Sequence, residues 1–228
     1  MPRSQPIIAI DGPSGSGKST VSKMLARRLG YVYLDTGAMY RCVGLLALRQ
    51  GLDPLSDEAL SPVLDGLAIR FELGDGETQK VFCNDQEVTL EIRRPEVSQA
   101  ASKASSRPLV REKLVAMQRK MGARGGVVME GRDIGTNVFP HADFKFFVTA
   151  SAVERARRRF LELQARGDRT TYEDVLADQL ERDKRDSERE LNPLIQAPDA
   201  ILIDTSNMSI DTVVEALAAV VEDRFRTC

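Results

Sequence analysis

Short apolar runs alternate along the chain with longer segments of helical periodicity. The first run, 7–10, precedes a segment in which Val21 and Leu25 occupy one face of a predicted helix. The second run, 31–34, precedes a helical pattern over 38–50. Strands that are apolar throughout and alternate with helices favour a parallel sheet with helices on both faces.

Three more apolar runs complete the predicted sheet, at 127–130, 143–148 and 200–204, and a helix over 209–225 follows the last of them. The sequence therefore predicts an α/β fold with five parallel strands and helices on both faces. Ligands of such sheets bind beyond the carboxyl ends of the strands. Polar residues at those ends are therefore candidates for a binding site.

The pattern changes between residues 51 and 105. After a short predicted helix at 56–64, three runs alternate apolar and polar residues between turn residues, which is typical of antiparallel hairpins. The runs are 68–73, 80–83 and 86–89, with turns at 74–76 and 84–85. This insertion is either a flap that covers a substrate or a hairpin without a functional role.

More helices are expected around the last two strands. Two of them, 95–105 and 108–121, each begin with a proline that suits a first helical turn. A charged segment at 151–189 is interrupted at Gly167-Asp168-Arg169, which predicts two further helices. Such a pair resembles a hinged lid, although charge runs are also typical of solvated helices.

Arginines of the charged segment have two interpretations. Arg155 and Arg157 belong either to a site or to solvated helix faces. Arg182, Asp186 and Arg189 recur at i, i+4 and i+7, so they share one helix face and can converge on one ligand.

Composition narrows the functional classes. The 228 residues suit one sizeable domain, and a net charge of -2 provides no overall attraction to nucleic acid. Cys42, Cys83 and Cys228 are too widely spaced for a disulfide framework or a zinc site, which favours a reducing cytoplasm. No stretch reaches the roughly 18 apolar residues of a membrane span, and no signal sequence is recognisable at residues 1–6.

The turn between the first strand and the first helix is rich in glycine. It reads Gly12-Pro13-Ser14-Gly15-Ser16-Gly17-Lys18-Ser19-Thr20 and fits G-x-x-x-x-G-K-[ST]. The glycines let backbone N–H groups face an anion, Lys18 can reach the β- and γ-phosphates, and Ser19 can bind Mg²⁺. The helix that begins near Lys18 adds its positive dipole end. These features predict a site for a nucleoside triphosphate with Mg²⁺, in a kinase, a GTPase switch or a motor.

Polar residues follow two other strands. We expect Thr36 to cap the next helix, and Arg41 either to point back toward the site or to lie on a solvated face. Arg132 and Asp133 either serve the site or pair with each other. Phosphoryl transfer needs positioning and charge neutralisation rather than a strong base. His141, the one histidine, is expected at the surface.

Several motifs resemble those of the bacterial cytidylate kinases, in the same order and across essentially the whole chain. They are the glycine-rich loop, Leu34-Asp35-Thr36-Gly37-Ala38-Met39-Tyr40-Arg41, Glu91-Ile92-Arg93, Glu130-Gly131-Arg132-Asp133-Ile134-Gly135-Thr136 and Glu181-Arg182-Asp183-Lys184-Arg185-Asp186. The resemblance implies a soluble monomer that uses ATP and Mg²⁺ to convert CMP or dCMP to CDP or dCDP. It also implies a single P-loop kinase domain, in which 1–50, 106–150 and 191–228 form the core, 51–105 the monophosphate-binding insertion and 151–190 the lid.

The resemblance also implies roles for individual residues. Cytosine is read by Ser102, Arg111 and Asp133. The acceptor phosphate is held by Arg41, Arg132 and Arg189, together with Arg93. The sugar is contacted by Arg182 and Asp186, and by Thr36, which stands where many relatives have serine. Charge on the transferring phosphoryl group is neutralised by Lys18, Arg132, Arg158 and Arg189, although Arg157 and Arg159 compete with Arg158 for that role. Glu130 stands where some relatives have aspartate, which affects the water around Mg²⁺.

Two alternatives remain at this point. One is another small-molecule kinase of the same fold, such as a uridylate or thymidylate kinase. The other is a P-loop GTPase or a regulatory nucleotide-binding protein. The chain contains no N-K-x-D tetrapeptide, and residues 130–133 do not fit D-x-x-G, so the sequence does not favour the GTPase.

Overall fold

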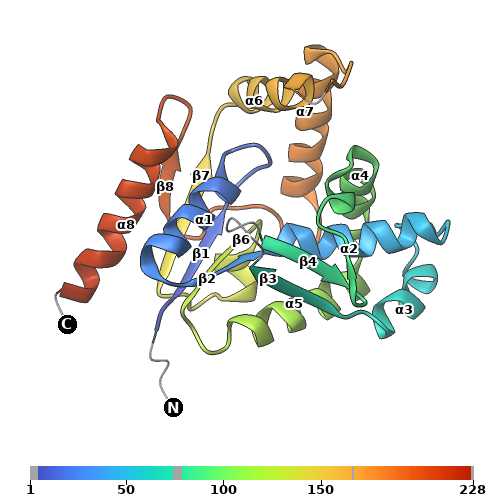
Figure 1. Cartoon of the computed structure of the whole chain (residues 1–228), viewed down its shortest axis with the longest axis horizontal. Coiled ribbons are helices and arrows are strands. Elements are labelled where there is room, and N and C mark those ends of the chain that lie inside the picture. Colours follow the sequence, from blue (N-terminus) through green and yellow to red (C-terminus); the bar gives the residue numbers. More distant parts are fainter. Residues whose placement is uncertain (1–4, 74–78, 166, 227–228) are drawn as a thin grey trace. The chain divides into compact units, whose positions relative to one another are not determined.

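The computed structural model describes residues 5–73, 79–165 and 167–226. The chain divides into two compact units (Figure 1). The first unit consists of residues 1–34 and 122–228, and the second of residues 35–121.

The first unit is built on a five-stranded parallel sheet with the order β2-β6-β1-β7-β8. The strands are β1 (Ile7–Asp11), β2 (Val32–Asp35), β6 (Val127–Gly131), β7 (Phe144–Thr149) and β8 (Ile201–Asp204). In the centre of the sheet, Ile8 of β1 is in register with Val128 on one side and Phe144 on the other. The predicted five-stranded parallel sheet is confirmed, with boundaries shifted by one residue or so.

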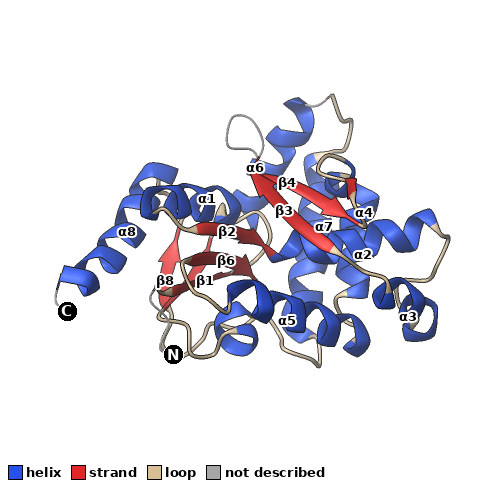
Figure 2. Cartoon of the chain, turned by 60° about the horizontal axis from the view of Figure 1, so that its bottom comes forward, coloured by secondary structure: helices blue, strands red, loops and turns tan. Residues whose placement is uncertain are grey.

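Both faces of β1 are buried, which explains its uninterrupted apolar sequence. Ile8 and Ile10 pack in one cluster with Leu25 of α1 (Lys18–Leu29) and Leu217 of α8 (Ile210–Arg226). These two helices lie side by side over the sheet (Figures 1 and 2). The sheet therefore holds its central strand, and the turn that follows β1, in a fixed position.

Two helices in contact with each other, α6 (Ala152–Ala165) and α7 (Tyr172–Glu188), follow β7, as the break at 167–169 predicts. Their contact is apolar and includes Ala156, Leu163 and Val175. The rings of Phe160 and Tyr172 meet edge to face, with centroids 6.0 Å apart. We call this pair the α6–α7 hairpin.

The second unit combines helices with a small sheet of order β3-β4-β5, in which neighbouring strands are antiparallel (Figure 2). The elements are α2 (Thr36–Arg49), α3 (Asp57–Asp65), β3 (Ile69–Leu73), β4 (Gln79–Cys83), β5 (Gln86–Glu87), η2 (Glu91–Arg93), α4 (Pro95–Ala104) and α5 (Pro108–Gly122). Asn84 and Asp85 have positive φ angles of 48° and 64°, which suits the tight turn before β5. The predicted hairpins are confirmed, while the turn expected at 74–76 lies outside the described residues.

The core of the second unit forms where α2 crosses α4. Gly44 lies so close to α4 that a Cβ atom there would be 2.7 Å from the backbone nitrogen of Ala101. Cys42 and Cys83 are free and buried in the same core. Glycine at position 44 therefore serves helix packing.

No helix within the described ranges is both long and apolar enough to cross a membrane. The predicted division into core, insertion and lid refers to function. The two units of the structure do not test it, so it stays a prediction.

Candidate active site

The glycine-rich turn leaves β1 and enters α1 with left-handed backbone at its glycines. The φ angles are 146° at Gly12, 77° at Gly15 and 87° at Gly17. A Cβ atom on Gly12 would lie 1.9 Å from the carbonyl oxygen of Val148. Any other residue at position 12 would therefore collide with β7 as well as adopt a strained backbone.

Lys18, in the first turn of α1, is 5% exposed. Its Nζ atom donates to the carbonyl oxygen of Pro13 at 2.5 Å and lies 3.4 Å from Oγ of Ser16, so the ammonium group folds back over the loop. Burial, followed by the nearby charge of Arg132, lowers the pKa of Lys18 to about 7. An anion in the loop would offset both effects.

Asp11 connects the end of β1 to the short helical turn η3 (Ile134–Val138). Its two carboxylate oxygens accept hydrogen bonds from the backbone nitrogens of Ile134 at 2.8 Å and Gly135 at 2.7 Å. Burial raises the pKa of Asp11 to about 6, although these hydrogen bonds act in the opposite direction. Asp11 thereby positions the chain directly after Arg132 and Asp133.

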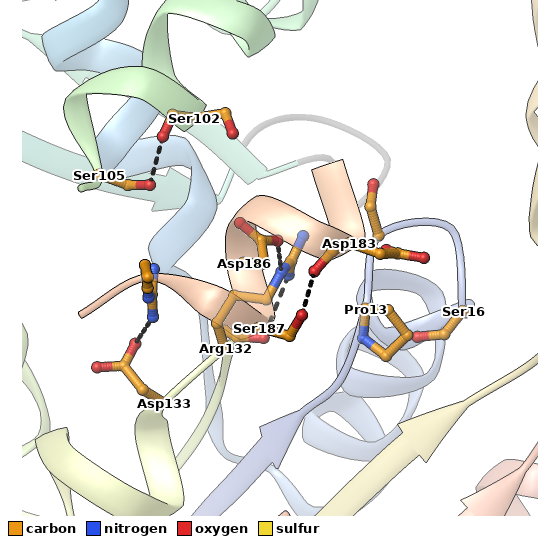
Figure 3. Close-up of polar contacts among 12 residues, drawn as sticks. Pro13, Ser16, Ser102, Ser105, Arg132, Asp133, Asp183, Asp186 and Ser187 are labelled. Atoms are coloured by element: carbon orange, nitrogen blue, oxygen red, sulfur yellow. Dashed lines mark hydrogen bonds and ion pairs between the residues drawn. The ribbon is translucent and has the colours of Figure 1, made fainter. Parts of the chain in front are cut away.

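Two ion pairs join that chain segment to the carboxyl end of α7. Nε of Arg132 donates to Asp186 at 2.8 Å, and Figure 3 shows the two side chains pointing toward one another. Arg189 lies 3.3 Å from Asp133. Arg132 and Asp133 therefore do not pair with each other. Arg132 pairs with Asp186, and Asp133 pairs with Arg189.

The pKa of Asp186 reflects the three arginines that surround it. Burial acts to raise the pKa of Asp186, but Arg132, Arg182 and Arg189 together hold it below its usual range. Arg182 also contributes to the lowered pKa of Lys18. Arg182 and Asp186 thus lie on α7 near the glycine-rich loop, whereas the expectation that Arg189 shares their helix face is wrong, because α7 ends at Glu188 and the backbone of Arg189 is extended.

The three neighbouring arginines of α6 differ in position. Arg157 and Arg159 pair with glutamates of their own helix. Arg158 also pairs with Glu154, but in addition it donates to the carbonyl oxygen of Thr205 at 2.7 Å, and the hydroxyl of Thr205 donates to the carbonyl oxygen of Ser16. Of the three, Arg158 is the one tied to the phosphate loop.

In the second unit, Asp35 caps α2 by accepting a hydrogen bond from the backbone nitrogen of Ala38 at 3.0 Å. The expectation that Thr36 caps this helix is wrong, because Thr36 is already helical while the backbone of Asp35 is extended. Arg41 donates to Asp35 at 2.8 Å. It therefore points back toward the start of α2 rather than into solvent, and Thr36 is buried beside it.

The residues assigned to cytosine within this unit are also buried. Arg111 of α5 is 3% exposed, and its guanidinium lies 5.9 Å from the ring centre of Tyr40. It approaches the carbonyl oxygen of Ser105 at 3.4 Å, and the Ser105 hydroxyl donates to the carbonyl oxygen of Ser102 (Figure 3). Arg111 and Ser102 are thus linked through one residue. Arg93 differs from them, since it is exposed at the end of η2.

Two buried side chains were not identified from the sequence. Arg155 was left undecided between a site and a solvated face, and it is 4% exposed beside the phosphate loop. Gln179 of α7 is 6% exposed and also contacts the loop. A glutamine within a charged helix carries no sequence signal of such a role.

The residues present fit a magnesium ion bound together with phosphate. Mg²⁺ in kinase sites keeps several waters and takes one or two protein ligands besides phosphate oxygens. Ser19 offers an exposed hydroxyl in the first turn of α1, directly after Lys18. Within the described ranges no group of three or more acidic, histidine or cysteine side chains could hold a metal without phosphate.

Comparison with known proteins gives consistent results. A family model described as cytidylate kinase matches residues 8–223. The chain is 50% identical over 218 residues to a cytidylate kinase of Citrifermentans bemidjiense, with 96% of this chain and 93% of that protein covered. It is 49% identical over 216 residues to a cytidylate kinase of Limosilactobacillus reuteri, with 94% of each chain covered.

Among solved structures, that of an uncharacterized protein from Eubacterium ventriosum matches with a TM-score of 0.51 at 15% identity. The match covers 96% of this chain and 99% of that one. At this level of identity the likeness concerns the fold alone.

Proposed function

Because the chain belongs to the cytidylate kinase family, we propose that it transfers the γ-phosphoryl group of ATP to CMP or dCMP, releasing ADP and CDP or dCDP. The resemblance noted in the sequence is confirmed, and the chain is a nucleoside monophosphate kinase. One observation supports the role of the site above all: Lys18 is buried and folds back over the glycine-rich loop, close to the charges of Arg132 and Arg182. Such a concentration of cations suits phosphate groups.

The donor is held by residues of the loop, which we propose to be Gly12, Pro13, Ser14, Gly15, Ser16, Gly17, Lys18, Ser19 and Thr20. Backbone N–H groups and the amino end of α1 receive the phosphates, and Lys18 contacts the β- and γ-phosphates. When bound, Mg²⁺ neutralises charge on these phosphates, and Ser19 is its protein ligand.

The first unit also contributes to the acceptor. We assign Arg132 and Arg189 to the acceptor phosphate and Asp186, with Arg182, to the sugar. Asp133 accepts a hydrogen bond from the exocyclic amine of cytosine, whereas uracil would present an oxygen there and be repelled. The ion pairs of Arg132 with Asp186 and of Arg189 with Asp133 hold these groups in position beforehand.

For the second unit, we assign Ser102 and Arg111 to the cytosine ring, Thr36 to the sugar, and Arg41 to the acceptor phosphate. The burial of Thr36, Ser102 and Arg111 supports specific roles rather than solvated surface. We also assign Arg93 to the acceptor phosphate, and it differs from these residues in that its side chain is exposed.

The reaction needs no nucleophilic side chain, because the acceptor phosphate is largely ionised at pH 7 and attacks the γ-phosphorus itself. The chain's task is to align the two phosphates and to neutralise the charge that develops between them. Lys18, Arg132, Arg158 and Arg189 supply positive charge for this purpose. Arg158 is preferred to Arg157 and Arg159 because of its bonds to Thr205 at the loop.

An assay of ADP release across CMP, dCMP, UMP, dTMP, AMP and GMP tests the proposal. We expect the cytosine nucleotides to have the highest kcat/KM, with no activity when Mg²⁺ is removed. Faster turnover of UMP or dTMP than of CMP would favour a uridylate or thymidylate kinase. Tight binding of GTP without transfer to any monophosphate would favour the GTPase interpretation.

Further expectations accompany this proposal. We propose that residues 51–105 act as the monophosphate-binding insertion and residues 151–190 as the lid of a single kinase domain. We also propose a cytoplasmic monomer whose partners are small molecules. Sedimentation of the purified protein with and without nucleotides checks the monomer.

A further inference from the structure

The carbonyl oxygen of Ser14, at the tip of the phosphate loop, accepts hydrogen bonds from both helices of the α6–α7 hairpin. Nη1 of Arg155, on α6, lies 3.0 Å from it. Nε2 of Gln179, on α7, lies 3.2 Å from it. Both side chains are more than nine-tenths buried. A loop carbonyl is thus held by two side chains from elements more than a hundred residues away in the sequence.

All three guanidinium nitrogens of Arg155 donate hydrogen bonds. Its Nε atom donates to the carbonyl oxygen of Ala150 at 2.9 Å, at the end of the sheet. Its two terminal nitrogens form a fork with Asp183 of α7, at 3.0 Å and 2.5 Å. Asp183 lies one turn after Gln179, so both face the loop from the same side of α7. Bidentate pairing of this kind fixes the plane of a guanidinium group.

The contact restricts the peptide bond between Ser14 and Gly15. No cis peptide occurs among the described residues, and in a planar trans peptide the N–H of Gly15 points opposite to the carbonyl of Ser14. Since that carbonyl faces the hairpin, the N–H faces away from it. Gly15 has a φ angle of 77°, and a Cβ atom there would lie 2.7 Å from Nε2 of Gln179.

We propose that Arg155 and Gln179 are positioning residues that keep the Ser14–Gly15 peptide oriented for ATP, with the N–H of Gly15 directed at a phosphate. Glycine permits a peptide to rotate at small cost, so an unrestrained loop would also sample the flipped peptide and lose this donor. The inference rests on the proposed use of the loop for ATP. Neither residue touches a reacting atom in this proposal, since both act through the Ser14 carbonyl.

The test is the substitution Gln179→Met, which keeps length and burial and removes the donor. We expect the Kd for a fluorescent ATP analogue and the KM for ATP to rise by roughly fivefold, which corresponds to one neutral hydrogen bond. The KM for CMP and kcat at saturating ATP should change less than twofold, as should the melting temperature within a degree or so. Gln164→Met, on the exposed face of α6, is the matched control and should leave all of these unchanged.

Arg155→Lys provides a second variant, because a lysine keeps the charge opposite Asp183 but cannot repeat the planar fork. It should also raise the KM for ATP selectively. The inference is overturned if Gln179→Met binds ATP as tightly as the natural chain. It is equally overturned if the affinities for ATP and CMP and the melting temperature fall together, which indicates a purely structural role. Failure of the unaltered chain to bind ATP would instead overturn the proposed function, and the inference with it.

Discussion

Arg132 and Asp186 form a partly buried ion pair between segments 54 residues apart, with 2.8 Å between Nε and Oδ2. A second pair, Arg189 with Asp133, joins the same two segments, but here the carboxylate comes from the segment that supplies the arginine of the first pair. Each arginine is therefore oriented by a carboxylate across the site. Groups held in this way stabilise developing charge without having to reorganise during the reaction.

Asp133→Ala removes the carboxylate that we assign to the amine of cytosine. Because Asp133 is 5% exposed and pairs with Arg189, its loss also removes a buried ion pair. We expect kcat/KM for CMP to fall by a factor equivalent to about 1–3 kcal/mol, and the preference for CMP over UMP to shrink. Steady-state kinetics with both nucleotides measure this. Asp178→Ala, at an exposed position of α7, is the control, and an unchanged CMP/UMP ratio would remove Asp133 from the role.

Replacing Arg158 should impair catalysis far more than replacing its neighbour. Arg158→Ala removes bonds to Thr205 beside the loop, whereas Arg157→Ala removes an exposed pair with Glu154. A stabilising arginine contributes about 10³-fold or more to phosphoryl transfer, so kcat should fall strongly for Arg158→Ala and less than twofold for Arg157→Ala. Equal kcat values for the two variants would contradict the assignment.

Binding of ATP should take up protons above neutral pH. The pKa of Lys18 is lowered to about 7 by burial and by Arg132, so at pH 8 its side chain is mostly neutral. A bound triphosphate raises that pKa, and about one proton should be taken up for each ATP bound. Calorimetry in two buffers of different ionisation enthalpy measures the uptake at pH 8, and the uptake should decrease as the pH is lowered toward 6, where Lys18 is already protonated. Binding heats that do not depend on the buffer at pH 8 would exclude this protonation.

The stability cost of Asp11→Asn should depend on pH. The pKa of Asp11 is raised from 3.8 to about 6, so between these values the folded protein holds a proton that the unfolded chain has released. Its contribution to the free energy of unfolding is therefore present below pH 4 and falls by up to about 3 kcal/mol as the pH rises through 6. Because asparagine does not titrate, the variant should lose more stability at pH 4 than at pH 7. Urea unfolding at both pH values checks this, and an equal loss at both would contradict it.

Glycine at position 44 should be required for packing of the second unit. Gly44→Ala places a Cβ atom 2.7 Å from the backbone of Ala101, and we expect a loss of at least about 1 kcal/mol despite the better helix propensity of alanine. At Gly66 a Cβ atom meets nothing within 4 Å and φ is -90°. Gly66→Ala should therefore be neutral or slightly stabilising. Thermal unfolding of both variants would show whether the signs differ.

Local signals explain why so much of the fold followed from sequence. Uninterrupted apolar runs predict strands buried on both faces, and the alternation with helices predicts their parallel order. The phosphate loop is recognisable because its glycines adopt φ angles that other residues avoid, and this requirement is local. The residue that caps a helix is harder to predict from the sequence than the loop. Asp35 and Thr36 both have capping side chains, and only the extended backbone at Asp35 decides between them.

By itself, the sequence determined the parallel sheet, the triphosphate loop, the antiparallel insertion and the membership of the family, because each depends on periodicity or on motifs of neighbouring residues. Only the tertiary structure decided which charged residues are partners. Arg155 and Arg157 stand two positions apart in one charged helix, yet the first is buried against the Ser14 carbonyl and the second is exposed. Likewise, Arg132 and Asp133 are adjacent but pair with Asp186 and Arg189. Charge acts through space, and distance along the chain does not measure it.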